Sequence, residues 1–144
     1  MNILKLYSAI FRITGTRKKR MKLFNEIMGP MSEHRILDIG GTPLNWEYLE
    51  VTPKITLVNK NAASQDQQTI PAGMELVEGD ATGLQYGDTE FDIAFSNSVI
   101  EHLYTRENQV TFALEAERVA KRVWIQTPAR GFFLAPHLIT PFVH

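Results

Sequence analysis

The hydrophobic positions of this chain follow two different spacings, and each spacing predicts a kind of element. In residues 3–13, 17–28 and 106–120, apolar side chains recur every three or four positions, as on one face of an amphipathic helix. Between these helices lie short apolar runs bounded by polar or glycine residues, which is typical of strands. These runs predict five strands: Arg35–Ile39, Ile55–Val58, Met74–Val77, Phe91–Ser96 and Arg122–Gln126.

The order of these elements predicts an open α/β sheet. The first, fourth and fifth runs lack a clean apolar–polar alternation, which is typical of strands buried on both faces of a parallel sheet. A helical segment separates the fourth and fifth runs, and the links of about 16 residues between the earlier runs suit parallel crossovers. We therefore expect a doubly wound, mostly parallel sheet of about five strands, preceded by N-terminal helices. In such a sheet the ligand binds outside the carboxyl ends of the strands, where the strand order reverses.

Polar residues and glycines follow four consecutive strands at the end where that ligand would bind. Taken singly, each is an ordinary turn or helix cap. Because the carboxyl ends of parallel strands meet at one edge of a sheet, their joint order predicts a single binding site. The residues are Gly40 and Gly41 after the first strand, Asn59 after the second, Asp80 and Ala81 after the third, and Ser96, Asn97 and Ser98 at the fourth.

With these elements in this order, residues 35–127 resemble the class I S-adenosylmethionine-dependent methyltransferases, and more narrowly the type 11 methyltransferase domain. The resemblance rests on the segments RILDIGG, ITLVN, EGDATGL, FDIAFSNSVIEHL and RVWIQTP, which stand in that family's order and approximate spacing. It implies a Rossmann-like sheet, S-adenosyl-L-methionine as cofactor, and methyl transfer to a small-molecule, glycan or lipid-linked acceptor. We accordingly divide the chain into an N-terminal helical segment, residues 1–30, and an S-adenosylmethionine-binding domain, residues 31–144.

The resemblance also implies a role for each residue at the predicted site. In that family, successive strand ends hold the methionine, ribose and adenine parts of the cofactor. Carried over to this chain, the resemblance implies that Asp38, Gly40 and Gly41 wrap the methionine part and that Asn59 holds the ribose hydroxyls. It implies that Asp80 binds the adenine amino group, with the Ala81 backbone beside it. Ser96, Asn97 and Ser98 would line the cofactor and face the acceptor.

Two features depart from the family's pattern. The loop after Gly41 lacks the later glycines, and Pro43 would hold the turn rigidly instead. Asn59 stands where the family has an acid. Its amide oxygen accepts one ribose hydroxyl bond, but a neutral acceptor binds more weakly than a carboxylate. We therefore expect a cofactor site of reduced affinity.

Two histidines are the candidates for catalysis. Transfer to a hydroxyl acceptor needs a general base within hydrogen-bond reach, and imidazole titrates near neutral pH. His102 belongs to a Glu-His pair that the family often has at the start of the helix after the fourth strand, where helix-start hydrogen bonding is the alternative role. His137 lies in the proline-rich tail, which forms part of the acceptor pocket in related enzymes. Adjacent helical residues point about 100° apart, so Glu101 and His102 chelate one ion poorly, and we expect no metal.

Composition narrows the class of protein. The chain has 144 residues, with 15 Lys and Arg against 16 Asp and Glu, and no cysteine. The absence of cysteine excludes disulfides, thiolate catalysis and cysteine-ligated zinc. The sequence contains neither an apolar run near the roughly 20 residues that span a bilayer nor a secretory signal pattern. We therefore expect a cytoplasmic globular protein.

Charge is distributed unevenly along the chain. Residues 1–35 hold eight Lys or Arg and two acids, whereas the remainder holds seven bases and fourteen acids. The basic run from Arg17 to Lys22 favours the solvated face of a leading helix, and a weak contact with an anionic membrane is the alternative. Because the rest of the chain is acidic, we expect no nucleic-acid partner.

The family's pattern continues past the fifth strand with another helix and an antiparallel strand pair, whereas only a short tail follows Gln126 here. A cut chain, a naturally shortened gene and a partner that completes the sheet would each explain this. We expect the fifth strand to be an exposed edge that allows an oligomer to form. Two other functions remain open. One is a catalytically silent cofactor-binding or scaffold domain, and the other is a nicotinamide-dependent oxidoreductase, which the absent GxGxxG disfavours.

Overall fold

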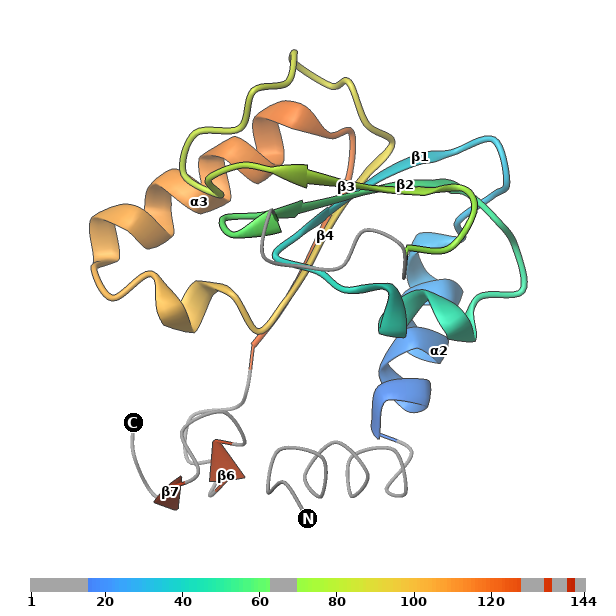
Figure 1. Cartoon of the computed structure of the whole chain (residues 1–144), viewed down its shortest axis with the longest axis horizontal. Coiled ribbons are helices and arrows are strands. Elements are labelled where there is room, and N and C mark those ends of the chain that lie inside the picture. The colour runs from blue at the N-terminus through green and yellow to red at the C-terminus, as the bar shows by residue number, and fades with distance from the viewer. Residues whose placement is uncertain (1–15, 63–69, 128–133, 136–139, 142–144) are drawn as a thin grey trace.

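The computed structural model describes residues 16–62, 70–127, 134–135 and 140–141. Within them the chain forms α-helices, short 3₁₀ helices, a central sheet and a separate strand pair (Figure 1). The helix predicted at 3–13 and the candidate His137 lie outside the described residues. The elements are α2 (Thr16–Met28), β1 (Arg35–Ile39), η1 (Pro43–Tyr48), β2 (Lys54–Asn59), β3 (Met74–Glu78), β4 (Ile93–Asn97), η4 (Ile100–His102), α3 (Arg106–Val119), β5 (Val123–Gln126), β6 (Leu134–Ala135) and β7 (Thr140–Pro141).

The central sheet has five strands in the order β3-β2-β1-β4-β5, and every neighbouring pair is parallel. Ile36 on β1 pairs with Ile55 on β2 and with Ile93 on β4. The strand order reverses between β1 and β4, as a doubly wound sheet requires. The predicted α/β fold is therefore confirmed. β6 and β7 form a separate antiparallel pair in which Leu134 faces Pro141.

The strand boundaries are close to the predicted ones, and the largest difference is at the start of β4. The sequence predicts that Phe91 opens this strand, but the regular ladder begins at Ile93. Phe91 instead forms an isolated parallel bridge with Ala120, and its N–H donates to the Val119 carbonyl at 2.9 Å. Phe91 is still buried, so its apolar character reflects packing at the strand's entrance rather than the ladder itself.

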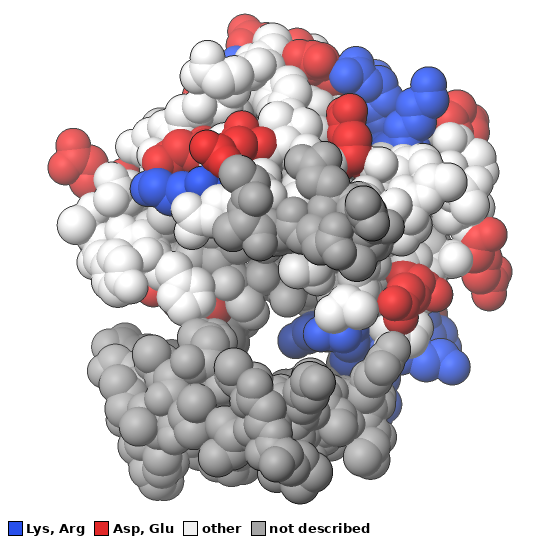
Figure 2. All heavy atoms as spheres, viewed as in Figure 1, with Lys and Arg blue, Asp and Glu red and all other residues white. Residues whose placement is uncertain are grey.

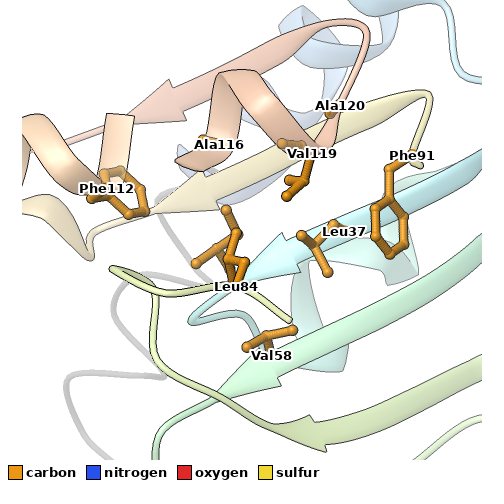
Figure 3. Close-up of a cluster of buried hydrophobic side chains, with 10 residues drawn as sticks. Leu37, Val58, Leu84, Phe91, Phe112, Ala116, Val119 and Ala120 are labelled. Atoms are coloured by element: carbon orange, nitrogen blue, oxygen red, sulfur yellow. The ribbon is translucent and has the colours of Figure 1, made fainter. Parts of the chain in front are cut away.

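Each face of the sheet packs against its own helix. On one face, Leu37 and Ile39 meet Phe112, Ala116 and Val119 of α3 (Figure 3). On the other face, Ile36 meets Met21, Phe24 and Met28 of α2, together with Trp46 of η1. Residues along β1 therefore alternate between the two cores, as the two-residue period of a strand requires. This double burial explains why β1 reads as a continuous apolar run.

Aromatic rings fill the core beneath α2. Phe24 makes edge-to-face contacts with Trp46, Phe95 and Trp124, with ring centroids between 5.2 and 5.8 Å apart. Such pairs contribute about 0.5–1.5 kcal/mol each beyond their buried area. α2 ends where Gly29 adopts a φ of 49°, a left-handed conformation that suits glycine at a helix terminus. α2 thus shares the core of the sheet, and the division after residue 30 stays a prediction.

β5 lies at one edge of the sheet and β3 at the other. All four residues of β5 are half-buried, whereas the inner strands β1 and β4 are almost entirely buried. The predicted edge position of the fifth strand is therefore confirmed for the described strands. Pairing of this edge with a second copy stays a prediction.

Candidate functional site

The carboxyl ends of β1, β2, β3 and β4 lie side by side, so the sheet brings the predicted site residues to one edge. The register places Asn59 at the end of β2 opposite Glu78 of β3, and Asn97 at the end of β4 opposite Gln126 of β5. The residues that follow these strands are consequently neighbours across the sheet, although they are far apart in sequence. Three loops and one strand terminus build the site.

The loop after β1 turns at Gly40. Its φ is 74°, a left-handed conformation that residues with a Cβ rarely adopt, and its N–H donates to the Val58 carbonyl at 2.7 Å. A Cβ at this position would also lie only 2.4 Å from Val99 Cγ2. Both backbone conformation and space therefore require glycine at position 40.

Gly41 is required for a different reason, which is the buried carboxylate beneath it. A Cβ on Gly41 would lie 1.8 Å from Asp38 Oδ2. Asp38 is fully buried on β1, where Oδ2 accepts a hydrogen bond from Trp46 Nε1 at 2.8 Å. Oδ1 is also buried and has no hydrogen-bond partner among the described residues. Asp38 thus packs under the loop and fixes its position through Trp46.

Burial raises the pKa of Asp38 to about 7, although the Trp46 hydrogen bond opposes the shift. The reason is that a charged carboxylate loses its hydration in the core, and one hydrogen bond compensates only part of that loss. In the structure Asp38 therefore acts first on the conformation of the loop. Its predicted contact with the methionine part of a cofactor stays a prediction.

Asn59 connects the β2 end to the same loop. Its Nδ2 donates to the Gly41 carbonyl at 2.8 Å. The amide nitrogen is therefore already hydrogen-bonded, whereas the amide oxygen is the atom that can accept a hydrogen bond from a ribose hydroxyl. A carboxylate at this position has no donor for the Gly41 carbonyl. The departure from the family's usual acid therefore has a local structural reason.

Asp80 follows β3 on an exposed turn and is already hydrogen-bonded. Its Oδ1 accepts from the Thr82 N–H at 2.9 Å and from Thr82 Oγ1 at 2.7 Å. Its Oδ2 lies 3.2 Å from Lys60 Nζ. The two hydrogen bonds from Thr82, together with Lys60, lower the pKa of Asp80 to about 2. Asp80 is therefore an ionised acceptor at any physiological pH, with Lys60 as a competing partner.

The chain after Asp80 is held on α3. Leu84 N donates to Glu115 Oε2 at 2.7 Å, and Arg118 Nη2 donates to the Leu84 carbonyl at 3.0 Å. Ala81 packs at the margin of the α3-side core. These contacts fix the position of the loop that carries Asp80 and the Ala81 backbone.

At the β4 end, the predicted residues differ in accessibility. Ser96 is buried, and its hydroxyl donates to the Ile39 carbonyl at 2.9 Å, which ties β4 to the end of β1. Asn97 is half-buried at the strand's terminus. Ser98 has a φ of 61°, and its N–H donates to the Gln126 carbonyl at 2.9 Å. A left-handed serine carries backbone strain, which concentrates at functional sites.

The sequence analysis presents His102 as a candidate catalytic base, and this role stays a prediction. His102 is the exposed last residue of η4, and α3 begins at Arg106 with Thr105 as its N-cap, whose Oγ1 accepts from the Asn108 N–H at 3.2 Å. A polar turn at Tyr104 and Thr105 separates the two helices, so the glutamate–histidine pattern marks η4 instead. In the part of the chain that the structure describes, no group of three or more histidines and acids stands close enough to hold a metal ion.

Sequence reasoning missed a contact between the ends of β4 and β5. Glu101 Oε2 accepts from Thr127 Oγ1 at 3.1 Å. Glu101 Oε1 is buried and has no hydrogen-bond partner among the described residues. The sequence pattern presents Glu101 only as a weak metal ligand. Its one available signal is its place after the fourth strand, with a threonine directly after the fifth.

The comparisons with known proteins identify the family. The model of the type 11 methyltransferase family, described as "Methyltransferase domain", matches residues 37–123. This range contains every strand end from β1 to β4, and it is more than half of the chain. The chain therefore belongs to this methyltransferase domain family. No curated protein matches the chain.

Solved structures share the fold at low sequence identity. A putative methyltransferase from an antibiotic biosynthesis pathway of Anabaena variabilis is 16% identical, with a TM-score of 0.59 over 75% of this chain and 44% of that one. The [4+2]-cyclase SpnF is 22% identical, with a TM-score of 0.55 over 72% and 41%. A SAM-dependent methyltransferase from Aquifex aeolicus is 15% identical, with a TM-score of 0.58 over 84% and 72%. The chain thus spans less than half the length of the first two.

These likenesses confirm the Rossmann-like methyltransferase fold, and several of the matched proteins are described as SAM-dependent. S-adenosyl-L-methionine as the cofactor of this chain stays a prediction. Among the described residues, no helix is long and apolar enough to cross a membrane.

Proposed function

We propose that this chain binds S-adenosyl-L-methionine at the carboxyl ends of β3, β2, β1 and β4, and transfers its methyl group to a small-molecule, glycan or lipid-linked acceptor. The observation that carries the proposal is the loop after β1. Gly40 and Gly41 each occupy a position where a Cβ would collide with a neighbour, and Asn59 holds the Gly41 carbonyl. Such a close-packed glycine turn between adjacent strand ends suits the close approach of a ligand to the backbone.

The residues present fit this cofactor. Gly40 and Gly41 offer backbone at the end of β1, the Asn59 amide oxygen suits a ribose hydroxyl, and the ionised Asp80 suits the adenine amino group. Asn97 and the strained Ser98 line the neighbouring β4 end. Asp38 and Ser96 support the strand ends from within the sheet, because their buried side chains are hydrogen-bonded to Trp46 and to the Ile39 carbonyl, respectively.

The acceptor is assigned to the other half of the edge. Cofactor residues occupy the ends of β3 through β4, which leaves the junction of β4 and β5 beside them. There the Glu101 carboxylate contacts Thr127 and keeps one buried oxygen without a described partner. A buried carboxylate oxygen needs a hydrogen-bond donor. We assign to it a hydroxyl or amine of the acceptor.

The cofactor supplies an electrophilic methyl group on a sulfonium, and the displacement is in line. The chain's task is then to align the two reactants and exclude water. An amine acceptor that is already nucleophilic needs no further group. A hydroxyl acceptor needs a base, and Glu101, His102 and His137 are the proposed candidates.

The test is a calorimetric titration with S-adenosylhomocysteine, the stable demethylated product. We expect saturable one-to-one binding that Gly41→Ala reduces at least tenfold, because the new methyl group must displace Asp38 or the loop. The matched control is Gly83→Ala, since a Cβ there has no atom within 4 Å. Both variants should show the circular dichroism of the native fold.

If the native chain is folded and S-adenosylhomocysteine does not bind, the proposal fails. If Gly41→Ala unfolds the chain, Asn59→Ala takes its place, because it removes the hold on the loop without adding an atom. Binding that neither variant alters would place the ligand elsewhere.

A second candidate is a cofactor-binding or scaffold domain without turnover. The observation that favours it is the engagement of Asp80 by Thr82 and Lys60, together with the neutral Asn59. SpnF, which shares the fold, is a cyclase. A transfer assay with labelled S-adenosylmethionine separates the two candidates. Labelled methyl groups on any acceptor would support the methyltransferase. No transfer while S-adenosylhomocysteine binds would support the domain without turnover.

A further inference from the structure

The outward face of α2 combines two properties that are unusual together. Its exposed basic residues are Lys18, Lys19 and Lys22. Beside them stand exposed apolar side chains, Leu23 at 46% and Ile27 at 59%, with Met31 at 48% just beyond the helix. Leu23 and Ile27 are four residues apart and share one side of the helix with Lys19. We call these six residues the α2 face.

The six residues of the α2 face take no part in the core that α2 forms with the sheet. Met21, Phe24 and Met28 are the residues that bury into the sheet. The exposed lysines have one acidic neighbour on the helix, Glu26, which lies 3.7 Å from Lys22 in an exposed pair. An exposed pair of this kind contributes little to stability. The α2 face is therefore positively charged, apolar in part and dispensable for the core.

The charge of the remaining chain orients the molecule. Residues from 36 onward carry fourteen acids against seven bases, so the positive potential is concentrated at the N-terminal region. In Figure 2, blue side chains lie at the lower right, where Figure 1 draws α2, and those at the upper right and at the left lie beside red ones. An anionic surface would attract α2 and repel much of the body.

We propose that the α2 face docks on anionic phospholipid membranes. Lysines at a membrane surface are attracted by acidic headgroups, and adjacent apolar side chains enter the boundary between headgroups and acyl chains. The apolar side chains favour a bilayer over a nucleic acid or an acidic protein, because polyanions offer Leu23, Ile27 and Met31 no apolar environment. The docking is peripheral and reversible.

The test is flotation of the whole chain with phosphatidylcholine vesicles that contain about 30% phosphatidylserine, against vesicles of phosphatidylcholine alone. We expect binding to the acidic vesicles that falls steeply between about 0.05 M and about 0.5 M salt. The combined substitution Lys18→Gln, Lys19→Gln and Lys22→Gln should weaken it about a hundredfold, at about fivefold for each lysine. Leu23→Asn with Ile27→Asn should weaken it roughly tenfold.

A matched control removes the same charge elsewhere. Lys54→Gln, Arg106→Gln and Arg122→Gln alter three exposed bases outside α2 and should leave binding close to that of the native chain. If both triple variants lose the same amount of binding to acidic vesicles, net charge alone explains the binding and the proposal is overturned. Binding to neither kind of vesicle, or equal binding to both at every salt concentration, would also overturn it.

Polyanions define the remaining outcome. A short single-stranded RNA or a polyglutamate peptide should compete weakly and be indifferent to Leu23→Asn with Ile27→Asn. If either binds as tightly as the acidic vesicles, the α2 face is a polyanion site and not a membrane site. The substitutions lie on the exposed side of α2, so near-native circular dichroism is expected for all variants.

Discussion

Replacement of Asp38 by asparagine should stabilise the protein at neutral pH and have little effect in acid. Asparagine has the same shape, and its amide oxygen can accept the hydrogen bond that Trp46 Nε1 now donates to the carboxylate. What the substitution removes is the cost of an ionisable group in the core. Since the Oδ1 of Asp38 has no described partner, no further contact is lost.

The magnitude follows from the pKa of Asp38. Burial raises it from 3.8 to about 7. Between these values the unfolded chain releases the proton and the folded chain retains it, so the folded state loses stability as pH rises. At about 1.4 kcal/mol per pH unit, the loss approaches about 4 kcal/mol above neutral pH and is absent below about pH 4. Asparagine does not titrate, so the Asp38→Asn variant should gain up to that amount relative to the native chain.

The assay is urea unfolding of the native chain and of Asp38→Asn at a series of pH values. The difference between the two free energies of unfolding isolates this carboxyl group, because every other group titrates in both proteins. Asp92→Asn is a control of opposite sign. Hydrogen bonds from Lys121 and from the Arg35 N–H lower the pKa of Asp92, so its loss should destabilise the protein at neutral pH and not in acid. If the difference in unfolding free energy between Asp38→Asn and the native chain is constant from about pH 4 to about pH 8, Asp38 does not have a raised pKa in the folded state.

Two further predictions concern the site. Asn59→Asp introduces the residue type that the family usually has, yet it should weaken S-adenosylhomocysteine binding and lower the free energy of unfolding by about 1 kcal/mol, because aspartate cannot donate to the Gly41 carbonyl. Calorimetry measures the binding and urea unfolding measures the stability. Tighter binding would contradict the structural role of Asn59. Glu101→Gln should leave S-adenosylhomocysteine binding within about twofold and lower methyl transfer at least tenfold once an acceptor is known, whereas an equal loss of cofactor binding would remove Glu101 from the acceptor side.

Much of the fold is predictable because its signals are local. The runs at Arg35–Ile39 and Ile55–Val58 become strands because most of their residues are buried on both faces of the sheet. The three-to-four spacing in 106–120 becomes α3 because one side of this helix packs against the sheet. Parallel pairing then follows from the links between strands. The positions of Gly40, Asn59, Asp80 and Asn97 at one edge follow from parallel pairing alone.

What the local pattern could not predict is the partner of each side chain. The sequence places Asp38 on the first strand and carries over a contact with the cofactor, which stays a prediction, but it does not show that the buried carboxylate accepts a hydrogen bond from Trp46. Asn59 holds the Gly41 carbonyl, which explains a residue that the sequence presents only as a departure. His102 ends η4 because Tyr104 and Thr105 delay the helix until Arg106.

The order and spacing of residue types along the chain are enough to predict the five strands, α2, α3, the parallel sheet and the family. Which groups contact each other at the strand ends depends instead on how the strands are arranged in space. Glu101 and Thr127 are 26 residues apart in sequence and meet because β4 and β5 are neighbours. The burial that raises the pKa of Asp38, and the exposure of Leu23 and Ile27 on α2, likewise depend on packing between distant segments. No local pattern carries that information, because burial is a property of the assembled fold.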